Sequence, residues 1–283
     1  MTTKRRSSAG RQLHAGRITY AVLIVFTMGS LFPLVWTAVA ASRTTTRLAQ
    51  TPPPFWFGGN LLQNLEIAWA DANMGVALLN STIVAGSVAA GTVAFSTLAG
   101  FAFAKLRFRF KNLLMLLVIG TMMVPPQLGV VPLYMLVAEL SWTDRLQSVV
   151  LPTLVSAFGV FFMRQYLVQA LPTELVEAAR ADGANSWRVI WHVVLPAARP
   201  AMAVLGMLTF VMAWNDFFWP IIALTQNGSP TVQVALTGLG RGYIPDQSVI
   251  MAGALLGTLP LLLVFVLFGR QIVGGIMQGA VKG

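Results

Sequence analysis

Two kinds of residue are scarce in this chain of 283 amino acids: cysteine and charged residues. Cysteine is absent, and Asp, Glu, Lys and Arg together supply 10% of the sequence, against about 25% in a typical soluble domain. Without cysteine there can be no disulfide scaffold, thiolate nucleophile, or zinc or iron–sulfur site that needs thiolate ligands. Only His14 and His192 remain for an imidazole cluster, so we expect no metal or cofactor in this chain. The shortage of charge, beside 56% hydrophobic residues, indicates an integral membrane protein.

Long uncharged runs predict the membrane-spanning segments. A helix needs about 20 apolar residues to cross the hydrocarbon core of a bilayer, and unpaired strands cannot span it. The first run follows Lys4, Arg5 and Arg6 but exceeds the length of a signal-peptide core, so we expect it to be retained. The prediction is an all-α fold with six transmembrane helices, at about Ile18 to Ala41, Val76 to Ala104, Leu113 to Val137, Gln147 to Leu167, Ala201 to Leu224 and Ser248 to Gly269.

The positions of the basic residues predict the orientation of these helices. Lysine and arginine concentrate in cytoplasmic loops. Fifteen of the 19 cations lie in the N-terminal arm, in the loops after the second and fourth runs or, in the case of Arg164, at the end of the fourth run beside its loop, or in the C-terminal tail. Both termini should therefore be cytoplasmic. The net charge of +10 then follows from topology, and we expect no nucleic acid partner.

One long connection is expected outside the cytoplasm, from Ser42 to Gly75. It contains a run of three prolines at 52–54, followed by aromatic residues and Gly58-Gly59. Proline runs are stiff and extended, and aromatic residues favour the membrane interface. The segment is either a rigid interfacial strap or a docking surface for an extracytoplasmic partner, and the residues do not decide between these.

The other long connection is cytoplasmic, at about 171–200, and predicts two helices. Pro172 marks a helix start and Gly183 its end. Asn185 or Ser186 can cap a second helix, which Pro196 and Pro200 should interrupt. Its apolar positions fall on one face, and are Trp187, Ile190, Trp191 and Val194. Such a hairpin either presents a rigid surface to a partner or lies in the membrane interface.

A motif in this hairpin resembles a known family. Glu177-Ala178-Ala179, Gly183 and Leu195-Pro196 are spaced as in the EAA signature of the membrane subunits of bacterial ABC importers, with Val193 where Ile is usual. Further motifs are similar to the shorter permease of maltose-type carbohydrate importers. They are the proline and aromatic stretch at 53–60, Asn80-Ser81-Thr82, Val124-Pro125-Pro126-Gln127 and the segment from Ala213 to Pro220.

The resemblance implies a transport subunit of the bacterial plasma (inner) membrane, not an enzyme. Its implied partners are a second homologous permease, two ATPase subunits, an extracytoplasmic sugar-binding protein and membrane lipid. The chain contains no phosphate-binding loop, which fits ATP and Mg bound on the partner ATPase. The residues implied to couple to that ATPase are Glu177, Ala178, Ala179, Asp182, Gly183, Leu195 and Pro196.

Polar groups at membrane depth mark a candidate substrate path, because they are costly unless they face a cavity or another helix. Asp216 is the one acid inside a predicted span, and it is either a sugar contact or a helix-end residue near Pro220. Prolines 125, 126 and 132 should kink the third span. The candidates for the path are Trp214, Asn215, Asp216, Trp219 and Gln127.

These features predict three regions: a basic cytoplasmic arm at 1–17, a six-helix permease domain at 18–270 that contains the coupling segment, and a cytoplasmic tail at 271–283. The expected cargo is a carbohydrate, an oligosaccharide or a glycoside. The alternatives are another cargo such as glycerol phosphate, or an ion-driven secondary transporter. The spans lack paired acids, which disfavours the ion-driven alternative.

Overall fold

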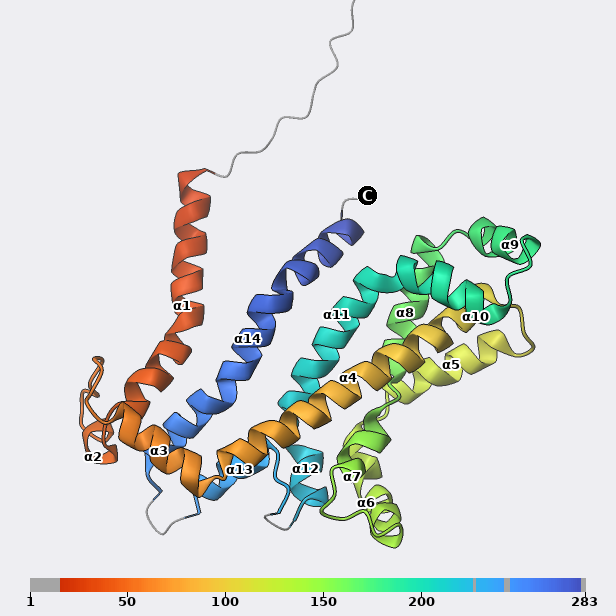
Figure 1. Ribbon diagram of the computed structural model, residues 1–283. Coiled ribbons are helices and arrows are strands. Elements are labelled where there is room, and N and C mark those ends of the chain that lie inside the picture. The colour runs from red at the N-terminus through yellow and green to blue at the C-terminus, as the bar shows by residue number, and fades with distance from the viewer. Residues whose placement is uncertain (1–15, 226–227, 242–244, 281–283) are drawn as a thin grey trace, which may run out of the picture.

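A computed structural model describes residues 16–225, 228–241 and 245–280, and these residues form helices without strands (Figure 1). The predicted basic arm up to residue 15 and the last three residues of the predicted tail lie outside the described residues. The α-helices are α1 (Arg17–Ala41), α2 (Thr45–Leu48), α3 (Leu61–Asp71), α4 (Met74–Lys105), α5 (Lys111–Met122), α6 (Val130–Glu139), α7 (Gln147–Val150), α8 (Ala157–Ala170), α9 (Thr173–Ala181), α10 (Ser186–Val189), α11 (Leu195–Trp214), α12 (Phe218–Ala223), α13 (Val232–Leu239) and α14 (Gln247–Ala280).

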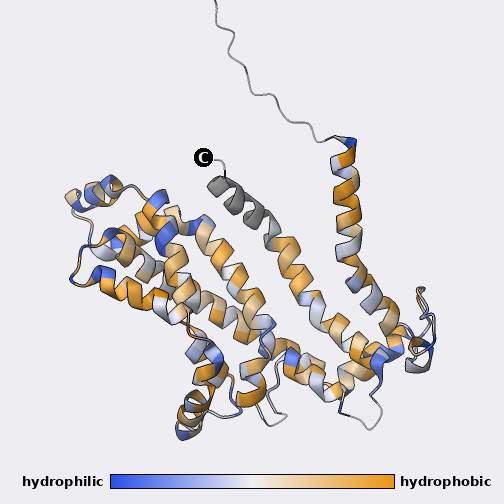
Figure 2. Ribbon diagram, turned by 180° about the vertical axis from the view of Figure 1, so that it is seen from behind, coloured by the Kyte–Doolittle hydropathy of each residue, from blue (hydrophilic) through white to orange (hydrophobic). Residues whose placement is uncertain are grey.

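Three of the predicted spans are continuous helices, namely α1, α4 and α14; α1 and α4 have nearly the predicted limits, whereas for α14 only the predicted start agrees. Helix α14 runs to Ala280, into the segment predicted as the tail. Among the described residues, four helices are long and apolar enough to cross a membrane, or up to six if two bent pairs each count as one span. Residues 18–35 of α1 are exposed and mainly apolar on all sides (Figure 2), as expected of a helix surrounded by lipid or by other membrane helices.

The third and fourth predicted spans are each broken. In the third, α5 and the segment Pro126–Glu139 meet at 92°, so the prolines cause a sharp bend where the sequence predicted a kink. The fourth bends by 41° between residues 153 and 157, which the sequence analysis did not predict. Pro152 cannot donate a backbone hydrogen bond in this region, and Ser156 caps the new helix by accepting from the Gly159 backbone N at 3.2 Å.

The limits predicted for the fifth span are wrong at both ends. Helix α11 begins at Leu195, directly after a π-helical turn at Ile190–Val194 that joins it to α10. Pro196 therefore does not interrupt the helix, although the sequence predicted that it would. Pro196 lies directly after the π-helical turn, where the regular hydrogen-bond pattern of the helix is already interrupted. The helix ends at Trp214, ten residues early. In a continuous helix the ring of Pro220 would clash with the Asp216 carbonyl, and a separate helix, α12, begins at Phe218.

The described helices leave two ends of the molecule distinguishable (Figure 1). Helices α4, α8 and α11 pack against one another, and α14 lies between α11 and α1 (Figure 1). The start of α1, the end of α14 and the α9–α10 hairpin lie toward one end, whereas α2, α3, α12 and α13 lie toward the other (Figure 1). This arrangement places both ends of the described chain with the hairpin.

Small residues allow α4 to approach α8. Thr92, Ser96 and Gly100 recur every four residues along α4 and are all buried, which makes one narrow stripe on the helix. A Cβ atom on Gly100 would lie 2.7 Å from Met163 Cβ and 2.8 Å from the Arg164 backbone N. The two backbones can therefore be this close only because residue 100 is glycine. Small residues have this role in membrane helix packing generally.

Candidate functional site

The hairpin predicted at about 171–200 is present, and its turn has the expected chemistry. Gly183 has φ of +79°, a left-handed conformation that glycine adopts without steric cost. Backbone hydrogen bonds close the end of α9, from Gly183 N to Arg180 O at 3.0 Å and from Ala184 N to Ala179 O at 2.9 Å. Asn185 then caps α10, because its Oδ1 accepts from the Arg188 backbone N at 2.9 Å. The predicted turn and cap are confirmed.

The outer face of α9 carries most of the residues that match the EAA motif. The side chains of Glu177, Ala178 and Asp182 are exposed, and Ala179 is half-buried. Among the described residues, Glu177 has no ion-pair partner and no side-chain hydrogen bond. The exposed face of α9 therefore carries acidic side chains and small alanine side chains, and it is accessible to a partner. Leu195 is half-buried and Pro196 exposed, both at the start of α11.

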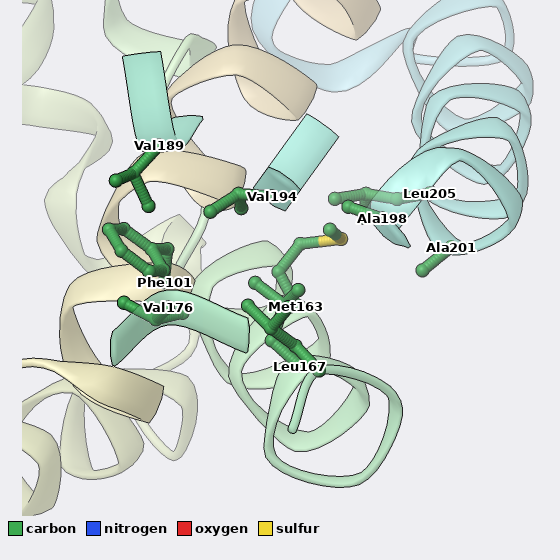
Figure 3. Close-up of a cluster of buried hydrophobic side chains, with 10 residues drawn as sticks. Phe101, Met163, Leu167, Val176, Val189, Val194, Ala198, Ala201 and Leu205 are labelled. Atoms are coloured by element: carbon green, nitrogen blue, oxygen red, sulfur yellow. The ribbon is translucent and has the colours of Figure 1, made fainter. Parts of the chain in front are cut away.

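The inner face of the hairpin is fixed to the spans by one hydrophobic cluster (Figure 3). Val176 of α9 and Val189 of α10 lie on either side of Phe101 of α4 (Figure 3), and each is at most 5% exposed. The cluster continues along α8, the residue after it, the π-helical turn and α11, with Met163, Leu167, Leu171, Val194, Ala198, Ala201 and Leu205. A further link joins α4 to α9, since Lys105 Nζ donates to Thr173 Oγ1 at 3.3 Å. Displacement of α9 must therefore act on α4, α8 and α11.

The apolar face predicted for the second helix is divided. Val189 and Val194 are buried, whereas Trp187 and Trp191 are 65% and 64% exposed. The reason is the π-helical turn, which the sequence analysis missed. A wider turn brings residues five apart onto one face, and the two buried valines are five apart. One feature of the sequence could have suggested this π-helical turn. Pro196 directly follows residues with a helical pattern, so a helix that continues past it needs an irregular turn.

Two of the candidate path residues are buried and bonded to other elements. Trp214 is 1% exposed and its Nε1 donates to the Gly257 carbonyl of α14 at 3.1 Å. Trp219 is 7% exposed and its Nε1 donates to the Ser148 carbonyl of α7 at 2.9 Å. Both indoles join neighbouring helices in these positions.

The other candidates are more accessible. Asn215 is exposed, and its Nδ2 donates to the Val211 carbonyl at 2.8 Å. Asp216 is half-buried, and its Oδ1 accepts from the Phe218 backbone N at 3.1 Å. This hydrogen bond is the helix-end role that the sequence left open for Asp216. Gln127 is exposed in the bend of the third span. It precedes α6, which packs against α12.

Hydrogen bonds hold the segment between α1 and α4 in place at more than one point. Arg43 donates from Nη2 and Nε to the Trp56 carbonyl at 2.6 and 2.9 Å. Asn64 Nδ2 donates to the carbonyls of Ala41 and Arg43 at 2.8 and 2.7 Å. The Arg43 bonds hold the aromatic stretch after the prolines, and the Asn64 bonds hold the start of α3, against the end of α1.

A second polar link joins this region to α14. The Oδ1 atom of Asp246 accepts from Thr45 Oγ1 at 2.5 Å and from the backbone N atoms of Ser248 and Val249 at 3.0 and 3.3 Å. Burial opposes ionisation of this carboxyl, but the hydrogen bonds outweigh it and hold the pKa of Asp246 below its usual value. Sequence analysis missed this contact, since the partners are about 200 residues apart.

Asn80 and Ser81, which belong to a family-like motif, have a structural role here. Asn80 Nδ2 donates to the Pro230 carbonyl at 3.0 Å, and Ser81 Oγ accepts from the Val232 backbone N at 2.8 Å. Both groups are buried in α4. They therefore hold the start of α13 against the second span.

Comparison with known proteins gives consistent matches over most of the chain. Residues 92–276 match the family model described as binding-protein-dependent transport system inner membrane component. The lactose transport system permease protein of Rhizobium radiobacter is 31% identical, over 94% of this chain and 96% of the relative. The sn-glycerol-3-phosphate transport system permease protein of Yersinia enterocolitica is also 31% identical, over 92% and 95%.

Two further matches extend this result. The arabinooligosaccharides transport system permease protein of Halalkalibacterium halodurans is 29% identical, over 90% of this chain and 92% of the relative. The fold is similar to a chain in the crystal structure of a bacterial ABC transporter involved in the import of the acidic polysaccharide alginate. That match has a TM-score of 0.77 at 20% identity, and it covers 91% of this chain and 98% of the other.

Proposed function

The chain belongs to the family of binding-protein-dependent transport system inner membrane components, and from that premise we propose that it forms half of the translocation pore of an ATP-driven carbohydrate importer. It is a transport subunit of the inner membrane. The other half of the pore is a second, homologous permease. Two ATPase subunits supply the energy, with ATP and Mg bound on them, and an extracytoplasmic sugar-binding protein delivers the cargo. Membership in a binding-protein-dependent family disfavours an ion-driven transporter.

The proposed topology has six spans with both termini in the cytoplasm. Each bent pair, α5 with α6 and α7 with α8, then counts as one span. The shared end of α1, α14 and the hairpin in Figure 1 supports this, because the basic loop at 105–111 lies there as well. The regions are a cytoplasmic arm at 1–17, the permease domain at 18–270 and a tail at 271–283.

The proposed coupling element is α9, with Glu177, Ala178, Ala179, Asp182 and Gly183 at the contact with the ATPase. The observation that supports this proposal is the difference between the two faces of α9. Its outer face is acidic and exposed, while its inner face is anchored in the cluster around Phe101 and Val176. A displacement of α9 is thereby transmitted to the three spans that contain α4, α8 and α11. Leu195 and Pro196 support the base of the hairpin at the start of α11.

The proposed cargo is an oligosaccharide or a glycoside. The names of the lactose and arabinooligosaccharide relatives support it. Glycerol 3-phosphate is the second candidate cargo, because the relative named for its transport has the same identity to this chain as the lactose relative. The predicted spans contain a single cation, Arg164, and an anion path would favour more. Asn215, Asp216 and Gln127 are the proposed contacts, with Trp214 and Trp219 holding the helices behind them.

The coupling proposal is tested by reversing one charge. The importer is purified with its partner subunits and reconstituted, and ATP hydrolysis is measured with and without sugar and binding protein. Glu177→Lys should abolish the stimulation while the complex still assembles in the membrane. The control is Glu174→Lys, which makes the same charge change on the same helix and should keep the stimulation. Full stimulation in Glu177→Lys would refute the assignment of α9.

A further inference from the structure

A shallow, open cleft of about 390 Å³ lies where α4 ends and α5 begins. It is formed by one continuous stretch of chain, and the side chains at its wall include Arg107, Phe108, Phe110 and Lys111. Phe110 adopts a left-handed conformation with φ of +61° at the start of α5. The Arg109 guanidinium lies 5.1 Å from the centre of the Phe110 ring, within the range of a cation–π contact.

The cations around this cleft have no anionic partner among the described residues. Lys111 Nζ donates only to the Leu106 carbonyl at 3.0 Å. Lys105 and Arg164 lie close enough to Lys111 for their positive charges to act on it. The Nε atom of Arg164 is buried and has no hydrogen-bond acceptor. Like charges gathered without carboxylates favour an anion between or beside them.

An apolar surface continues directly from the cleft along α5. Phe108 and Phe110 are 39% and 61% exposed. Beyond them, four leucines of α5 are each at least 43% exposed, namely Leu113, Leu114, Leu116 and Leu117. A soluble anion would use the cations alone, whereas a lipid has a charged head and two acyl chains that match both surfaces. The combination therefore favours a lipid.

We propose that this cleft binds the phosphate headgroup of an anionic phospholipid of the cytoplasmic leaflet, with its acyl chains against the exposed leucines of α5. Basic pockets beside membrane helices on the cytoplasmic side bind such headgroups. Lys105 connects the site to the hairpin, because it also donates to Thr173 at the start of α9. The inference rests on the proposed topology and is independent of the proposed cargo.

The test measures lipid binding to the purified full chain by native mass spectrometry in detergent. Phosphatidylglycerol and phosphatidylcholine with the same acyl chains are titrated in parallel. Each basic residue near an anionic surface contributes about fivefold in affinity. Arg107→Gln/Lys111→Gln should thus weaken phosphatidylglycerol binding roughly 25-fold. Arg107→Gln alone, at an exposed residue that leaves the fold intact, should weaken it about fivefold.

The control removes two exposed cations from the opposite end, in Arg47→Gln/Arg145→Gln, and should leave phosphatidylglycerol binding unchanged. Wild-type binding of phosphatidylcholine should be much weaker than that of phosphatidylglycerol. The proposal is overturned if Arg107→Gln binds phosphatidylglycerol as the wild type does, or if both lipids bind equally. Displacement of the lipid by millimolar inorganic phosphate would also overturn it, by assigning the cleft to a soluble anion. Because transport is not the readout, failure here is distinct from failure of the importer assignment.

Discussion

Gly100 lies where α4 meets the backbone of α8, so one added methyl group tests the packing of these spans. In Gly100→Ala, the new Cβ would lie 2.7 Å from Met163 Cβ and 2.8 Å from the Arg164 backbone N, against 3.4–4 Å for ordinary contact. The obstructing atoms belong to backbone and Cβ positions, which cannot rotate away. The two helices must therefore separate by about 0.7 Å or distort, and overpacking of this kind costs about 1–3 kcal/mol.

A matched control removes the effect of helix propensity. Alanine is favoured over glycine by about 1 kcal/mol in any helix interior, which offsets part of the cost at Gly100. Gly86 is in the same helix, and a Cβ there would meet nothing within 4 Å. Gly86→Ala should therefore be neutral or slightly stabilising. The difference between the two variants isolates the clash, and should be about 1–3 kcal/mol with Gly100→Ala the less stable.

The assay is unfolding of each purified variant by heat and by increasing SDS in mixed micelles, followed by circular dichroism. Transport by the assembled importer should fall in Gly100→Ala and not in Gly86→Ala, if the α4–α8 contact transmits movement from the hairpin. Equal stability of the two variants would refute the close approach of the helices. Greater stability of Gly100→Ala would refute it as well.

Three more outcomes are expected. Val176→Asp buries a charge in the cluster that anchors α9, at a cost of several kcal/mol; sugar-stimulated ATP hydrolysis should be lost while the spans remain folded, and normal stimulation would contradict the anchoring role. Asp246→Ala removes the cap of α14 and should cost about 1 kcal/mol in thermal or SDS unfolding. Because the folded pKa of Asp246 is lowered, the wild-type advantage should be constant above about pH 4 and decrease as the pH falls through the folded value; an advantage independent of pH would contradict this. Asp216→Asn keeps a group that can accept from the Phe218 backbone N, so loss of transport with normal assembly indicates a path role, whereas normal transport indicates the helix-end role.

The distribution of charged residues along the sequence predicted much of the fold. Placing a charged side chain in lipid costs a large free energy, and this cost depends on that residue's own position. The continuous helices α1, α4 and α14 follow directly from the uncharged runs. Local backbone chemistry predicted the hairpin equally well, through Gly183 and Asn185. These signals need only neighbouring residues, and a single sequence contains them.

Features that depend on tertiary packing were missed. The π-helical turn before Pro196 and the bend before Ser156 require knowledge of what surrounds the chain. The same holds for Trp214, whose indole donates to a carbonyl 43 residues away. Its aromatic ring and depth suggested a sugar contact, and nothing local indicated the bond to α14. Residue type alone therefore did not indicate which of the candidate side chains are bonded to neighbouring helices.

The most direct test of the account asks what touches α9. The chain has no cysteine, so one introduced thiol carries a photo-crosslinker to a single place. Ala178→Cys, on the exposed face of α9, should crosslink to a nucleotide-binding ATPase subunit in the transporting complex. Ser141→Cys, exposed near the opposite end, should not. If Ala178→Cys labels no such subunit while transport continues, the proposal that α9 couples this chain to ATP hydrolysis is contradicted.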